Sequence, residues 1–179
     1  MLVLGTGVGG GVISNGKLLQ GINGAAGRLG HLSIDPTGPQ CSCGNHGCME
    51  LFISGTAIAQ VVNEDRELRN SISPNGTEEL TAQDVVQAAK SGNPFALKLM
   101  ESTGEKLGYG LLQIARAFDP EMIAIGGGMI SAEELLLGSA RKIVEFGTPP
   151  ELVPPQVEIA QLGADASLLG AAALGWSID

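Results

Sequence analysis

The sequence contains few aromatic and few basic residues, and each shortage makes a class of protein less probable. Aromatic residues make up only 3% of the 179 positions, whereas apolar residues reach 44% and glycine supplies 27 positions. This composition favours an α/β protein with many tight turns over a β-sandwich or a coiled coil. Ten Lys and Arg face nineteen Asp and Glu, which gives a net charge of −9. Because nucleic acid is bound by clustered basic residues, and the basic residues here are scattered, we expect no nucleic-acid partner.

The sequence also has no long apolar run. No stretch approaches the roughly 20 apolar residues of a membrane span, and no basic segment followed by an apolar run marks a signal peptide at the N-terminus. The three cysteines are an odd number, which fits a reducing compartment. We therefore expect a cytoplasmic protein without a membrane partner, long enough for one compact domain.

All three cysteines lie close to one histidine. His31, Cys41, Cys43 and Cys48 fall within eighteen residues, in a segment rich in glycine and proline that can fold around one ion. Three thiolates and one imidazole satisfy tetrahedral Zn²⁺ and leave no position for water, which predicts a structural rather than a catalytic zinc site. Two alternatives stay open: the cysteines are buried as small apolar residues, or His46 competes as a ligand.

The remaining sequence alternates short apolar strands with longer helices, as expected for a sheet covered by helices. Residues 1–4 read as a strand, which lies either at a sheet edge or continues a part of the protein further upstream. A polar surface connection is expected over 64–81. In the helix that begins at Pro94, Gly104 and Gly108 indicate close packing. The expected elements are a hairpin over 12–19, helices over 51–63 (with a soft spot at 54–55), 81–90, 94–118, 131–146 and 166–174, and strands over 122–125 and 157–160.

Two glycine-rich turns follow apolar strands, at Gly5–Gly11 and at Gly126–Gly128. Without side chains, their backbone N–H groups can approach an anion, and Thr6 adds a hydroxyl donor. The second turn opens a helix, so a positive helix end faces its ligand. Tight hairpin turns alone would also explain these glycines. Two such turns after two strands nevertheless favour one nucleotide held between them.

Several motifs together resemble the ROK family (repressors, open reading frames, sugar kinases) over essentially the whole chain. These are Gly5-Thr-Gly-Val-Gly-Gly-Gly11, Gly24-Ala-Ala-Gly27-Arg28-Leu-Gly30-His31, Cys41-x-Cys43-Gly44-x-x-Gly47-Cys48-x-Glu50, Ile123-Ala-Ile-Gly-Gly-Gly128 and Leu169-Gly-Ala-Ala-Ala173. The resemblance implies an actin-like ATPase (ribonuclease H-like) fold, with a mixed sheet, covering helices and a small zinc-binding insertion at 31–50. Residues 1–179 would form the C-terminal lobe, and the N-terminal lobe would be absent from this chain.

The resemblance also implies roles for individual residues. Gly5, Thr6 and Gly7 match positions that hold the phosphates of ATP, and Gly126 and Gly127 match the adenosine side. His31 and Glu50 match residues that hydrogen-bond sugar hydroxyls, and His31 would also bind zinc. Zinc ligation at one ring nitrogen fixes the other N–H as a donor. ATP with Mg²⁺, a hexose and a second copy of the chain are the implied partners.

Two departures from the family pattern bear on function. The catalytic Asp of family kinases comes from the N-terminal lobe, so no residue here is assigned to catalysis and the isolated chain should not catalyse. The Glu usually found three residues before the zinc histidine is Arg28, a donor-only guanidinium. Two alternatives follow: the site prefers an acidic or phosphorylated sugar to a neutral hexose, or it has lost its ligand.

The leading hypothesis is an ATP-dependent, glucokinase-like hexose kinase, a transferase of carbohydrate metabolism. One alternative is the sugar-sensing domain of a ROK-type transcriptional repressor. The other is a non-enzymatic, zinc-stabilised interaction module.

Overall fold

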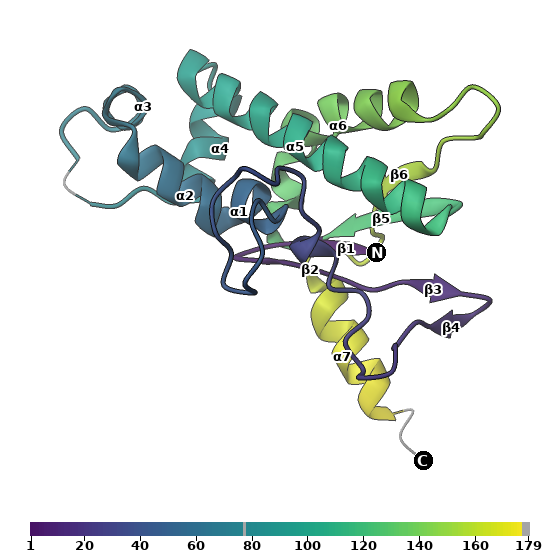
Figure 1. The fold of residues 1–179 in the computed structure, drawn as a ribbon. Coiled ribbons are helices and arrows are strands. Elements are labelled where there is room, and N and C mark those ends of the chain that lie inside the picture. The colour runs from purple at the N-terminus through teal and green to yellow at the C-terminus, as the bar shows by residue number, and fades with distance from the viewer. Residues whose placement is uncertain (77, 177–179) are drawn as a thin grey trace.

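The computed structural model, which describes residues 1–76 and 78–176, is built around a four-stranded mixed sheet (Figure 1). Its strands lie in the order β2 (Val8–Gly10), β1 (Leu2–Leu4), β5 (Met122–Gly126) and β6 (Gln156–Ile159). β1, β5 and β6 run parallel, and β2 turns back antiparallel to β1. The expected mixed α/β sheet is therefore confirmed.

The strand β1 lies inside the sheet and not at its edge. It pairs with β2 on one side and with β5 on the other, and the Leu2 and Leu4 side chains are almost completely buried. The edge-strand alternative is therefore wrong. An apolar strand paired on both sides is typical of a sheet that helices cover.

Most helices lie where the sequence predicts them. In the 25-residue helix α5, the Asn93 side chain accepts hydrogen bonds from the N–H groups of Phe95 and Ala96, and Asp119 ends the helix in the left-handed conformation. The α-helices are α1 (Glu50–Ile53), α2 (Gly55–Glu64), α3 (Arg66–Ile72), α4 (Ala82–Lys90), α5 (Pro94–Phe118), α6 (Glu133–Gly147) and α7 (Ala166–Trp176), and the 3₁₀ helices are η1 (Leu29–His31), η2 (Gly128–Ala132) and η3 (Gly163–Asp165).

The prediction of a surface connection over 64–81 is wrong in its first half, which forms the helix α3. The Asp65 carboxylate accepts hydrogen bonds from the N–H groups of Glu67 and Leu68, and so caps the helix. Leu68 is buried in the core. Tertiary packing of Leu68 and the Asp65 cap support this short helix, and the surrounding charged residues concealed both in the sequence.

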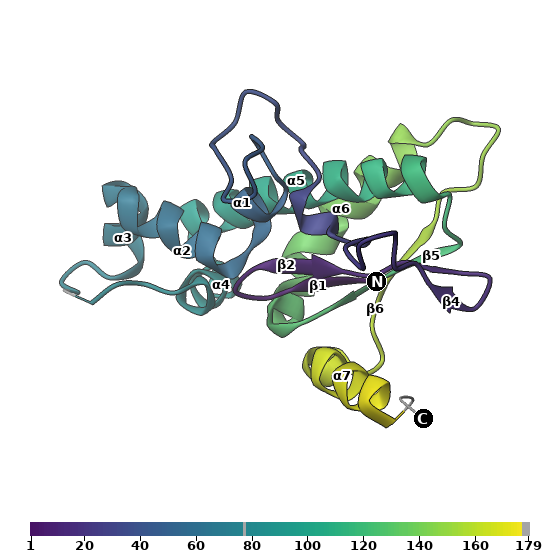
Figure 2. The same cartoon turned by 60° about the horizontal axis from the view of Figure 1, so that its bottom comes forward.

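Helices α5 and α6 cover one face of the sheet, and α7 lies on its other side (Figure 2). A β-carbon at Gly104 would lie 2.7 Å from the Leu136 carbonyl oxygen, and one at Gly108 would lie 2.9 Å from the Ala140 Cα atom. The expected close packing at these two glycines is therefore confirmed. No described helix combines the length and apolarity required to cross a membrane.

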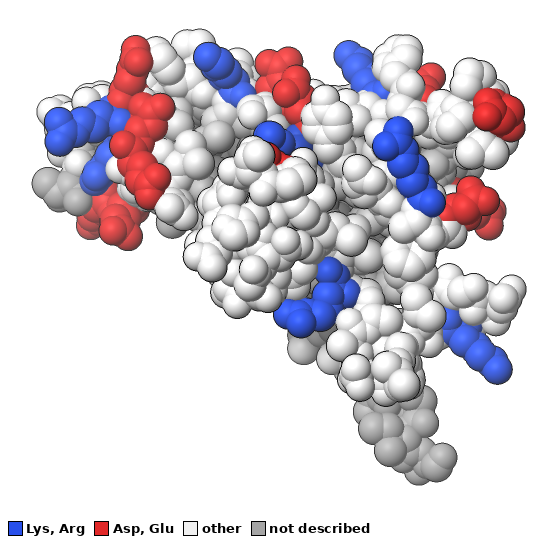
Figure 3. All heavy atoms as spheres, viewed as in Figure 1, with Lys and Arg blue, Asp and Glu red and all other residues white. Residues whose placement is uncertain are grey.

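A second, two-stranded sheet projects beside the main one (Figure 1). It consists of β3 (Ile13–Ser14) and β4 (Lys17–Leu18), joined by Asn15 and Gly16 at positive φ, as the hairpin signature predicts. On the face seen in Figure 3, the Lys and Arg side chains are separated by uncharged and acidic residues.

Candidate functional site

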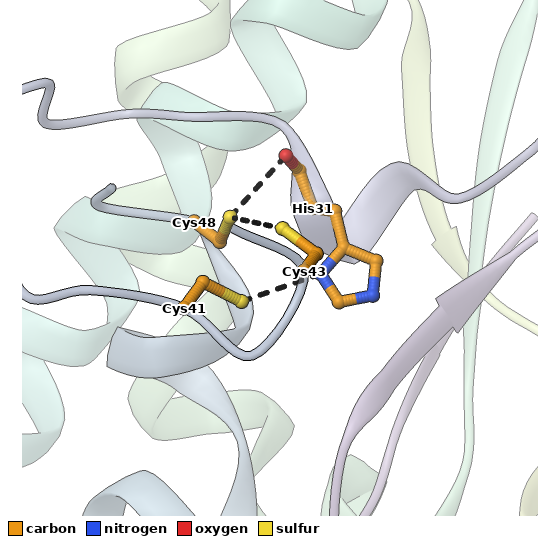
Figure 4. A group of neighbouring side chains, drawn as sticks. All are labelled: His31, Cys41, Cys43 and Cys48. Atoms are coloured by element: carbon orange, nitrogen blue, oxygen red, sulfur yellow. Dashed lines mark hydrogen bonds between the residues drawn. The ribbon is translucent and has the colours of Figure 1, made fainter. Parts of the chain in front are cut away.

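Three cysteines and one histidine converge in the loop that crosses the helices near α1 (Figure 4). His31 ends η1, and Cys41, Cys43 and Cys48 lie on the following turns. Backbone hydrogen bonds from Cys41 to Asn45 and from Gly47 to Pro39 close these turns. The ligand atoms of the three cysteines and the histidine all lie within 4.8 Å of one another. The sequence prediction that these four residues form one group is therefore consistent with the fold.

Two distances within the group match those around a tetrahedral ion. Metal–sulfur bonds of about 2.3 Å and metal–nitrogen bonds of about 2.0–2.1 Å imply ligand separations of roughly 3.5–3.8 Å. The Cys43 and Cys48 sulfurs are 3.6 Å apart, and the Cys41 sulfur is 3.5 Å from His31 Nδ1. These residues could therefore hold a metal ion with little rearrangement.

The thiols of this group differ in acidity. A hydrogen bond from the Cys43 backbone lowers the pKa of Cys41 to about 6, whereas burial raises the pKa of Cys48 to about 12. Cys41 is thus a ready thiolate ligand, and a metal ion would have to displace the proton of Cys48.

His46 lies outside this group. Its side chain is exposed, its N–H donates to the Asn45 side chain, and its carbonyl accepts from the Ser33 hydroxyl. The alternative in which His46 replaces His31 finds no support in this arrangement.

The three residues expected to bind sugar lie on different parts of this loop region. His31 turns Nδ1 toward the sulfurs, and its other ring nitrogen lies on the far side from them (Figure 4). Glu50 follows the last cysteine by two residues and begins α1. Arg28 precedes η1 and its side chain is exposed, with no hydrogen bond or ion pair to a described residue.

The first glycine turn, Gly5–Gly7, connects β1 to β2 and is held by the start of α2. The Gly5 carbonyl accepts from the Gly55 N–H at 2.8 Å, and the Thr6 carbonyl accepts from the Thr56 hydroxyl at 2.8 Å. The N–H groups of Thr6 and Gly7 have no hydrogen-bond partner among the described residues. Such free donors can bind an anion.

The second glycine turn lies directly beside the first. Gly127 has φ of +97°, and a β-carbon there would overlap the Leu4 carbonyl, so only glycine fits. The turn leads first into the 3₁₀ helix η2 and only then into α6, which differs from the single helix expected over 131–146.

Both turns contribute to one open cavity of about 880 Å³. Gly5 and Thr6 line it from the first turn, and Gly128 and Met129 line it from η2. Gly7, Gly126 and Gly127 adjoin these lining residues but do not line the cavity. Its volume suits a nucleotide-sized ligand.

The sequence analysis missed the outer wall of this cavity. Residues 79–83 form that wall, and Asn63 of α2 holds it by donating to the Leu80 carbonyl and accepting from the Leu80 N–H. The capping-box pattern at Thr81 predicts where α4 begins. It does not indicate that the beginning of α4 faces the glycine turns.

Several known proteins are similar to this chain in sequence. The model of the ROK family matches residues 1–177. A glucokinase of Halalkalibacterium halodurans is 37% identical over 184 residues, covering 99% of this chain and 55% of that protein. The xylose repressor of Bacillus subtilis is 32% identical over 92% of this chain and 40% of its own length. The chain thus spans about half the length of the curated relatives it matches, or less.

Among solved structures, a ROK family glucokinase from Streptomyces griseus, crystallised in complex with glucose and AMPPNP, superimposes with a TM-score of 0.83. It is 34% identical in sequence, and the match covers 97% of this chain and 58% of that one. The similarity extends over nearly all of the present fold.

Proposed function

Because this chain belongs to the ROK family, we propose that it forms the C-terminal lobe of a glucokinase-like sugar kinase. The observation that carries the proposal is the cavity shared by the two glycine turns, in a fold that superimposes on a glucokinase holding glucose and AMPPNP. In the whole protein, the activity would be ATP-dependent phosphorylation of a hexose.

The nucleotide would lie across the two turns. The free N–H groups of Thr6 and Gly7 would bind its phosphates, and Gly126 and Gly127 would leave space on the adenosine side. Donors without a partner can bind an anion without first breaking a hydrogen bond, which favours this turn as the phosphate site. Titration of the chain with Mg-AMPPNP tests this proposal, which expects saturable binding.

The sugar would lie near the segment 31–50, which contains the candidate metal group and is called the metal loop below. His31 would donate from the ring nitrogen that faces away from the sulfurs, and Glu50 would accept from a hydroxyl. The exposed Arg28 would donate to an acidic or phosphorylated substituent of the sugar. Because the Arg28 guanidinium can donate but not accept hydrogen bonds, it would favour sugars that carry an acceptor group.

The metal would be zinc, held by His31, Cys41, Cys43 and Cys48. Three sulfurs and one nitrogen within 4.8 Å of one another favour Zn²⁺ over ions that prefer oxygen. When bound, zinc would supply a structural crosslink. The protein's own residues would then keep the His31 ring in one orientation.

The catalytic base would come from the part of the protein that corresponds to the N-terminal lobe of the relatives. Phosphoryl transfer requires a group that accepts the hydroxyl proton, and we assign that role to no residue of this chain. We therefore expect the isolated chain to bind ligands without catalysis. A homodimer, a cytoplasmic location and the absence of a nucleic-acid partner belong to the same proposal.

The sugar-sensing domain of a repressor is the second candidate, since a xylose repressor is 32% identical to this chain. Nucleotide binding separates the two hypotheses. In isothermal titration calorimetry of the metal-loaded chain, the kinase proposal expects saturable heats with Mg-AMPPNP and with a hexose or acidic hexose derivative. Sugar binding without nucleotide binding would favour the repressor, and binding of neither ligand would favour a zinc-stabilised interaction module.

A further inference from the structure

The first glycine turn, Gly5–Gly7, is called the phosphate turn below. Both ends of the segment 50–56 form hydrogen bonds with this turn or with Val8, the residue after it. At one end, Gly55 and Thr56 donate to the Gly5 and Thr6 carbonyls. At the other, the Glu50 carboxylate accepts a hydrogen bond of 2.7 Å from the Val8 N–H. The turn is thus fixed by residues that lie more than forty positions later in the chain.

The backbone of Glu50 is itself held firmly. The preceding residues Cys48 and Met49 are completely buried, and the Met49 N–H donates to the Leu32 carbonyl at 2.9 Å. Cys48 belongs to the candidate metal group. Glu50 therefore connects the rigid end of the metal loop to the turn.

The position of this carboxylate is unexpected for a phosphate site. A β-carbon at Gly7 would lie 2.7 Å from Glu50 Oε2, so a negative charge stands beside the proposed phosphate donors. If Glu50 acted only through its charge, it would repel phosphate, and its removal would strengthen nucleotide binding. If it acts by holding Val8, its removal would weaken binding because the turn would lose its fixed shape.

We infer that Glu50 is a positioning residue for the nucleotide, which fixes the Gly5–Gly7 turn through the Val8 N–H and ties it to the metal loop. This inference rests on the proposed function. It assigns to Glu50 a role toward the phosphate turn that is separate from any contact with sugar. The sign of the effect on nucleotide affinity distinguishes it from an electrostatic role.

The test is calorimetry of Mg-AMPPNP binding to the metal-loaded chain, in the absence of sugar, with three substitutions. Glu50→Gln keeps an acceptor oxygen at the same reach but removes the charge. Glu50→Asp keeps the charge but withdraws it by one methylene group, and Glu50→Ala removes both. Glu101→Ala, which removes an exposed carboxylate from α5, is the matched control. Amide hydrogen exchange at Val8 is measured on the same proteins.

We expect Glu50→Ala and Glu50→Asp to lower the AMPPNP affinity about tenfold and to speed exchange at Val8, because both substitutions remove the hydrogen bond that holds the Val8 N–H. Glu50→Gln and Glu101→Ala should bind as the unmodified chain does. If Glu50→Ala fails to fold, the AMPPNP affinities of Glu50→Asp and Glu50→Gln are compared to test the inference. Equal or tighter binding by Glu50→Asp, or a loss in Glu50→Gln as large as in Glu50→Asp, would overturn the inference alone. An unmodified chain that binds no AMPPNP would overturn the proposed function as well.

Discussion

The side chain of Met49 lies directly against Gly110 of α5, so close that a β-carbon at position 110 would overlap the Met49 sulfur. Met49 separates the metal ligand Cys48 from Glu50, and all of its side chain is buried. The loop that carries the candidate metal group is therefore anchored to the longest helix of the fold.

This contact predicts a large effect of a small substitution. Gly110→Ala should lower the free energy of unfolding by about 1–3 kcal/mol, because the added methyl group forces Met49 to move in a close-packed core. Chemical denaturation measures the change. Gly138→Ala is the control, since nothing lies within 4 Å of a β-carbon there and alanine favours the helix α6 by about 1 kcal/mol. Equal stabilities for the two variants would contradict the described packing.

The metal group predicts which histidine is a ligand. The unmodified chain should contain one zinc ion, His31→Ala should lose most of it, and His46→Ala should retain it, because only His31 faces the sulfurs. Elemental analysis of the purified proteins after dialysis provides the measurement. Loss of zinc in His46→Ala with retention in His31→Ala would show that the ligand assignment is wrong.

Arg28 predicts the charge of the preferred sugar. Its guanidinium should favour a hexose that carries a carboxylate or phosphate over glucose, and Arg28→Glu should reverse this preference, because a carboxylate accepts from neutral hydroxyl groups and repels anions. Competition between glucose and glucose 6-phosphate in calorimetry gives the ratio of affinities. Lys17→Glu makes the same change of charge on the exposed hairpin and should leave the ratio unaltered. An unchanged ratio in Arg28→Glu would remove Arg28 from the sugar site.

The start of α4 predicts a pH dependence of stability. Hydrogen bonds from the Thr81 hydroxyl and N–H hold the pKa of Asp84 below its ordinary value. A lowered folded-state pKa means that Asp84 stabilises the fold above its unfolded-state pKa, and that this contribution disappears as the pH falls through the folded-state pKa.

Asp84→Asn should therefore cost about 1 kcal/mol at pH 7, as for other lost helix caps, and progressively less below about pH 4. Urea denaturation across this range measures the difference. Glu101→Gln should show little change at any pH, since Glu101 is exposed. A constant difference between Asp84→Asn and the unmodified chain down to the acid limit would contradict the capping role.

Local signals in the sequence predicted much of the fold, because capping and turn residues act on their immediate neighbours. Pro94 predicted the start of α5, and Asn15–Gly16 predicted the hairpin. The four metal-group residues could be identified because they lie close together in the chain. The approach of the two glycine turns was foreseen from the strand pattern, although the wall at 79–83 was not.

Contacts between distant residues could not be predicted in this way. Glu50 and Val8 are separated by 42 positions, and the contact between them depends on how α1 packs beside the sheet. The pairing of Asn63 with Leu80 has the same origin. Helix α3 was missed for a different reason, since its cap and its one buried leucine stand among charged residues typical of a surface loop.

A residue-resolved NMR titration of the metal-loaded chain with Mg-AMPPNP shows whether the two glycine turns hold one nucleotide. We expect the amide signals of Thr6, Gly7, Val8 and Gly128 to shift together along one saturation curve. Saturable shifts confined to the second cavity, between α3 and α4, or no saturable shift in either glycine turn would contradict this proposal.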